Sequence, residues 1–195
     1  FWMFNYIIQL SNSARAQIDI LLIGPLFGFT LVGNYFLGLQ VVGLFLILPL
    51  IIFKYTLPQD SSGSSTKQIK IIAVVASIGF ALLGIFVAPE VILFALPEYA
   101  DTVELIPLLS LAIIPRTVTT MLMSGFLGKE NNMHLLVGNL IAFSIVVLGI
   151  LYLPEYFDIV GLAIAYLLSV TIQTIYLLII YLRTAKTQNL NTNRV

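Results

Sequence analysis

Charged residues are scarce in this sequence, and cysteine is absent altogether. Only 9% of the 195 positions hold Asp, Glu, Lys or Arg, whereas a soluble domain carries about 25%. Hydrophobic residues make up 59%. No soluble fold of this length could bury that much apolar surface, because a large part of a small domain stays in contact with water. A lipid bilayer removes that difficulty, so the composition predicts an integral membrane protein.

Other absences narrow the function. Without cysteine there are no disulfides, thiolate metal sites or cysteine nucleophiles. A net charge of zero gives no basic field to attract nucleic acid. There is no Walker A loop, no H-E-x-x-H motif and no acidic cluster for metal-dependent transfer, and a single histidine makes a Ser-His-Asp set implausible. We therefore expect no enzyme, no metal and no cofactor.

Long apolar runs separated by turn residues predict an all-α protein with about six transmembrane helices. Each run approaches the roughly 20 apolar residues that a spanning helix needs. The predicted helices cover about 1–24, 31–55, 69–88, 102–127, 133–153 and 160–182. The segment 58–68 reads as the one clearly soluble loop, 90–96 as a short apolar piece at the membrane interface, and 183–195 as a polar tail.

The loop charges predict the orientation of these helices. Lys and Arg occur in every second connection and in the tail, whereas the alternate connections carry only acidic charges or none. By the positive-inside rule, both ends of the chain are then cytoplasmic. We expect a multi-pass protein of the cytoplasmic membrane. Since the sequence begins at Phe1 with no basic segment before the apolar run, we also expect it to be a piece of a longer protein.

The first predicted helix carries a continuous polar stripe. Its members recur every three or four residues and so fall on one face, and Arg15 and Asp19 are spaced to pair. The stripe consists of Asn5, Gln9, Asn12, Arg15 and Asp19. One interpretation is a neutral pair that joins this helix to a neighbour. The other is a face that lines an aqueous path, since five polar side chains exceed what helix packing needs.

A second polar face is predicted around Arg116, midway along 102–127. Pro115 frees the carbonyl of Leu111 from its helical bond, and broken membrane helices are tolerated where they face protein or a cavity. Arg116 either neutralises Asp19 and caps free carbonyls, or lines a cavity as a cation. The other members of this face are Thr117, Thr120 and Ser124.

Several short segments, taken in order, resemble the C-terminal half of the polysaccharide-export flippases. These proteins are the O-antigen and polysaccharide transporter branch of the MATE-like (MOP) exporter superfamily. The resemblance lies in A-Q-I-D-I-L-L-I-G at 16–24, V-G-N-Y at 32–35, F-A-L-P-E-Y-A at 94–100, G-F-L-G-K at 125–129, and L-P at 153–154 with G-L-A-I-A at 161–165. It departs from the family pattern at Ala95-Leu96, where a glycine is usual.

The resemblance implies a fold and a function. Residues 1–182 would form one six-helix lobe of a two-lobe transporter, 183–195 a cytoplasmic tail, and the N-terminal lobe of the same protein would precede them. The expected activity is the flipping of an isoprenoid-linked oligosaccharide across the membrane by alternating access. From their chemistry, we expect Arg15 and Arg116 to attract its pyrophosphate. The expected cavity residues are Gln9, Asn12, Arg15, Asp19, Arg116 and Thr120, with that lipid-linked sugar and membrane lipid as partners.

Three alternatives stay open. An ion-coupled multidrug exporter of the same superfamily would need an acidic cavity for its mostly cationic drugs, whereas the charges predicted at membrane depth are two arginines and one aspartate. A non-transporting membrane scaffold subunit would not need a polar stripe. A membrane-embedded transferase is disfavoured by the lack of a metal-binding acidic cluster.

Overall fold

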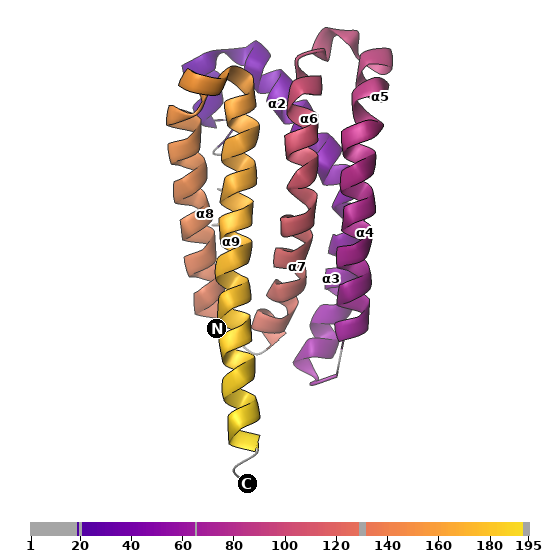
Figure 1. Ribbon diagram of the computed structural model, residues 1–195, viewed down its shortest axis with the longest axis vertical. Coiled ribbons are helices and arrows are strands. Elements are labelled where there is room, and N and C mark those ends of the chain that lie inside the picture. Colours follow the sequence, from indigo (N-terminus) through magenta and orange to yellow (C-terminus); the bar gives the residue numbers. More distant parts are fainter. Residues whose placement is uncertain (1–18, 20, 65, 129–131, 193–195) are drawn as a thin grey trace.

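The computed structural model describes residues 19, 21–64, 66–128 and 132–192, and this part of the chain is helical, without strands. Most of its helices run side by side along the long axis of the molecule (Figure 1). Their bounds are α2 Phe29–Phe45, α3 Ile47–Ser61, α4 Lys67–Phe86, α5 Ala88–Ala95, the 3-10 turn η1 Pro97–Tyr99, α6 Thr102–Leu111, α7 Ile113–Gly128, α8 Asn132–Tyr152 and α9 Pro154–Thr192. Residues 21–27, before α2, are also helical.

Three helical stretches are long and apolar enough to cross a membrane: α4, Met133–Tyr152 of α8 and Pro154–Thr184 of α9. The pairs α2–α3 and α6–α7 add a fourth and a fifth if each pair is one bent span. Many large apolar side chains on these helices face outward, as a lipid solvent requires. The described residues therefore indicate an all-α, multi-pass membrane protein. Three of the six predicted helices have a counterpart among them, or five if each bent pair is one span, and the first, 1–24, lies mostly outside the described residues.

Two of the predicted helices are broken. The α2–α3 pair bends by 47° around Leu46, and the α6–α7 pair by 41° around Ala112. Each break lies three residues before a proline, Pro49 or Pro115. A proline ring removes one helical bond and presses on the carbonyl four positions earlier, which opens the helix there. The break expected from Pro115 is confirmed, whereas the expectation of one uninterrupted helix over 31–55 is wrong.

Some predicted boundaries also move. The segment 31–55 was expected to stop before Pro58, but α3 continues through this proline to Ser61. The turn there is polar, so the carbonyl that Pro58 leaves unbonded can be hydrated. The soluble loop is correspondingly shorter than 58–68. The chain kinks within α9 at the non-helical Asp158 (φ 47°, ψ −138°), so its long part begins close to the predicted residue 160, after a short helical segment, and it ends later than 182.

Small residues let the helices approach closely. A Cβ built on Gly149 of α8 would lie 2.5 Å from the Ala165 Cβ of α9, and α8 and α9 pack along most of their length. A larger side chain at Gly149 would separate them. Around this contact lies the main apolar core, formed by Ile23, Tyr35, Val42, Leu105, Leu109, Ile113, Val146, Ile150, Leu162, Ala163 and Ala165.

The connections segregate to the two ends of the bundle as the loop charges predict. Figure 1 shows the α3–α4 connection, the start of α8 and the far end of α9 at one end, with the α5–α6 and α8–α9 connections at the other. Lys67 and Lys70 begin α4 at the first end. The acidic Glu90, Glu98 and Asp101 lie on or beside α5, η1 and α6 at the second.

Candidate functional site

A cavity of about 250 Å³ lies between four helices, directly beside one of the two breaks. The residue at the α2–α3 break, Leu46, is part of its wall. The apolar part of the wall also includes Leu50, Phe53 and Met123. The polar part consists of Arg116, Thr119, Thr120, Asn139 and Gln173, from α7, α8 and α9. An apolar wall with a few converging polar groups is typical of a ligand site.

Arg116 is the only charged residue among the described residues that line this cavity. It is partly buried and lies about midway along the α6–α7 pair, just after Pro115. Within the described ranges, the guanidinium has no ion pair and no hydrogen bond. A positive charge at membrane depth that lacks a protein partner needs water or an anionic ligand. Arg116 thus lines a cavity within this chain, and its role toward a substrate stays a prediction.

The polar face predicted around Arg116 divides in the structure. Thr120 lines the cavity with Arg116 and donates a hydrogen bond to its backbone carbonyl at 2.9 Å. Thr117 is buried and is not part of the cavity wall. Ser124 belongs to a different polar cluster, around Asp60. Thr119, which the sequence did not single out, joins the wall instead.

Thr174 of α9 fixes α7 next to the cavity. Its hydroxyl lies 2.8 Å from the carbonyl of Pro115, 2.8 Å from the carbonyl of Val170 and 2.8 Å from the hydroxyl of Thr119. The contact to Pro115 satisfies a backbone oxygen in the first turn of α7, after the break. Polar contacts of this kind join membrane helices because lipid cannot compete for them. The α7 segment that carries Arg116 is thus anchored to α9.

Besides Thr119, sequence reasoning missed two polar site residues, Asn139 and Gln173. Gln173 Nε2 donates to Asn139 Oδ1 at 2.7 Å, across α9 and α8. Both side chains are buried, with 2% of Gln173 and 5% of Asn139 exposed. Each is an uncharged amide in the middle of an apolar run, so neither stands out when only charged side chains are sought at membrane depth. The rule that intramembrane polar side chains face the interior would have found both.

Asp19 is buried at a different place. Its Oδ2 accepts a hydrogen bond from the Tyr35 hydroxyl at 3.1 Å, and Tyr35 belongs to the main apolar core. Asp19 does not line the cavity, and the one ion pair between described residues joins Lys70 to Asp60. The structure therefore does not bring Asp19 and Arg116 together. The remaining predicted site residues, Gln9, Asn12 and Arg15, lie outside the described part of the chain.

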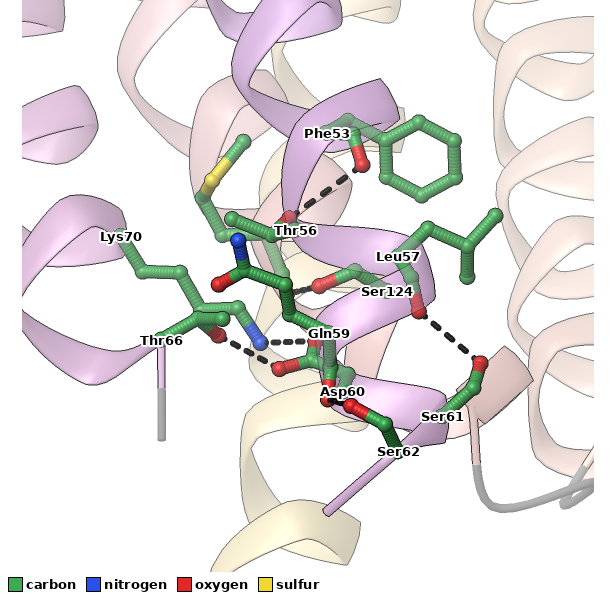
Figure 2. A network of polar contacts seen from close by, with 11 residues as sticks. Phe53, Thr56, Leu57, Gln59, Asp60, Ser61, Ser62, Thr66, Lys70 and Ser124 are labelled. Atoms are coloured by element: carbon green, nitrogen blue, oxygen red, sulfur yellow. Dashed lines mark hydrogen bonds and ion pairs between the residues drawn. The ribbon is translucent and has the colours of Figure 1, made fainter. Parts of the chain in front are cut away.

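A second polar cluster surrounds Asp60 at the basic end of the bundle (Figure 2). Lys70 Nζ and the Thr66 hydroxyl each donate to the Asp60 carboxylate at 2.5 Å, and Ser124 of α7 lies beside it. Asp60 follows the apolar part of α3, which ends at Leu57, and so lies outside the hydrocarbon. Burial raises the pKa of Asp60, but hydrogen bonds from Lys70, Thr66 and Ser124 outweigh it and hold the pKa below 3.8. This cluster ties α3, α4 and α7 together away from the cavity.

Comparison with known proteins assigns this chain to no family. No protein-family model, no curated protein and no solved structure matches this chain.

Proposed function

We propose that this chain forms one six-helix lobe of a flippase that moves an isoprenoid-linked oligosaccharide across the cytoplasmic membrane by alternating access. The observation that carries the proposal is the Arg116 guanidinium, which has no partner among the described residues and lines a cavity where a few polar side chains converge. A pyrophosphate group cannot cross about 30 Å of hydrocarbon unaided. A cavity with a fixed cation replaces part of its hydration, while the lipid tail stays in the bilayer.

The same observation distinguishes this proposal from a cationic-drug exporter. Such an exporter needs carboxylates in its cavity, and among the described residues none lines this one. Asp19 is the one acidic residue that the sequence analysis expected in the cavity, but its side chain contacts Tyr35 and does not line the cavity. Electrostatics at the site thus favour an anionic substrate over a cationic one.

The test is a flipping assay in proteoliposomes with the purified full-length, two-lobe protein that contains this chain, using a fluorescent isoprenyl-pyrophosphate oligosaccharide. Arg116→Ala should lower the initial rate by about 100-fold, while abundance stays near normal. Arg116→Lys should keep part of the activity, because Lys retains the charge but loses the planar fork. Lys67→Ala, which removes an exposed cation at the start of α4, is the matched control and should leave the rate unchanged.

A double variant separates substrate binding from charge balance. If Arg116 only balanced Asp19, then Arg116→Leu combined with Asp19→Leu would restore both abundance and transport. We expect no rescue, because the two residues form no ion pair. Full transport by the double variant would refute the proposed role. Uptake of a cationic dye that is lost in Asp19→Asn, with no lipid flipping, would favour the multidrug exporter.

A further inference from the structure

The side-chain amide of Asn139 has a hydrogen bond at its oxygen and none at its nitrogen among the described residues. Its Oδ1 accepts from Gln173 Nε2 at 2.7 Å. Its Nδ2 has no hydrogen-bond partner within the described ranges, although only 5% of the residue is exposed. A buried donor without an acceptor is costly, so such a group is expected to serve a ligand or water. Asn139 lines the cavity, which is where that acceptor would lie.

Two polar groups of the cavity wall, the Arg116 guanidinium and Asn139 Nδ2, have no partner among the described residues, and both are donors. Arg116 carries only N–H donors, and the end of Asn139 that is not used by Gln173 is an amide N–H. The Thr120 hydroxyl already gives its hydrogen to the Arg116 carbonyl. Since none of the described lining residues is acidic, a matching ligand brings acceptor oxygens and negative charge. A cavity of about 250 Å³ accommodates a phosphate or pyrophosphate group with water.

We propose that Arg116 and Asn139 together form a subsite for a phosphate-type oxyanion, and that Gln173 is the positioning residue that keeps the Asn139 donor available. The proposal rests on the proposed function and adds two residues from α8 and α9 to the α7 side of that site. Gln173 acts through the amide orientation: by donating to Oδ1, it prevents Asn139 from turning its acceptor toward the anion. The Asn139 N–H thereby gives the subsite a directional hydrogen bond in addition to the positive charge of Arg116.

The test measures binding of inorganic pyrophosphate to the purified protein in lipid nanodiscs by calorimetry. Asn139→Leu removes the donor, and the isosteric Asn139→Asp replaces it with a charged acceptor. We expect pyrophosphate to bind about tenfold more weakly to Asn139→Leu and more weakly still to Asn139→Asp. Gln173→Glu should also weaken binding, because a carboxylate there attracts Asn139 Nδ2 and turns the acceptor outward. Ser144→Ala, on the exposed side of α8, is the control and should bind normally.

A second readout guards against variants that fail to fold. In wild-type protein with ¹⁵N-labelled asparagine, pyrophosphate should shift the side-chain amide signal of Asn139, and Arg116→Ala should abolish that shift. An unshifted Asn139 signal at saturating pyrophosphate would overturn the proposal, as would normal affinity in Asn139→Leu and Asn139→Asp.

The same variants in the flipping assay separate this inference from the proposed function and identify the source of the oxyanion. Weakened pyrophosphate binding together with slowed flipping of the isoprenyl-pyrophosphate oligosaccharide identifies a lipid-borne anion. Weakened binding without any flipping by the full-length, two-lobe wild type supports the subsite for a free oxyanion but overturns the proposed function. Normal binding in the Asn139 variants with flipping that still depends on Arg116 overturns the subsite and leaves the proposed function standing.

Discussion

At Gly84, a single hydrogen atom in place of a side chain lets α4 pack against α6. A Cβ built there would lie 2.7 Å from the Ser110 Cβ, closer than two carbon atoms can approach. Gly84→Ala should therefore lower the free energy of unfolding by about 1–3 kcal/mol. Gly79→Ala, on the same helix with nothing within 4 Å, is the matched control and should be neutral or slightly stabilising.

Thermal unfolding in detergent compares the two alanine variants. Equal transition temperatures for Gly84→Ala and Gly79→Ala would contradict the close α4–α6 packing.

The ion pair between Asp60 and Lys70 allows a second prediction about single residues. Lys70→Met leaves the partly buried carboxylate without its cation and should destabilise the protein by about 1–2 kcal/mol at neutral pH. The bonded Asp60 has a pKa below 3.8, so its contribution is complete at neutral pH and is lost as the pH falls below 3.8. The difference from wild type should accordingly shrink in acid. Lys67→Met, which removes an exposed lysine from the same turn, serves as the control.

At the scale of elements, the bend in α2–α3 depends on Pro49. Pro49→Ala restores an N–H donor for the Phe45 carbonyl and should straighten the pair. In this cysteine-free chain, spin labels at Thr30→Cys and Ser61→Cys report the change. Removing a 47° bend over this length should lengthen their separation by about 4 Å.

The matched control for that experiment is Pro58→Ala, since Pro58 lies inside α3 at a point where the helix does not break. An unchanged label distance in Pro49→Ala would show that packing, and not the proline, imposes the bend.

These prolines also show where prediction from sequence ends. Pro115 correctly marked the α6–α7 break, yet Pro58 and Pro107 lie inside helices that continue past them. A proline removes the same bond in each case, and the neighbouring helices decide whether the chain bends. Sequence periodicity likewise placed Arg116 and Thr120 on one face correctly. It could not show that Asn139 and Gln173 join them, because that meeting depends on how three helices pack.

At the scale of the whole molecule, the positive-inside rule predicts that Gly63 and the segment after Arg183 are cytoplasmic, whereas Tyr99 and Tyr156 face outward. The connections that carry these residues fall at opposite ends of the bundle, as that prediction requires (Figure 1). Single cysteines at Gly63 and Tyr99 should react with impermeant reagents from opposite sides of intact cells. Labelling of both from the same side would contradict the arrangement.

The polar cluster at Asp60 has a mechanical consequence for the two broken helices. The segments below the breaks, α3 and α7, pack along each other, and Asp60 joins them to α4 through Ser124, Thr66 and Lys70. These contacts fix α3 and α7 to each other at the end far from the breaks. We therefore expect a change in the bend at Leu46 to shift α7, and Arg116 with it, so that the two sides of the cavity move together.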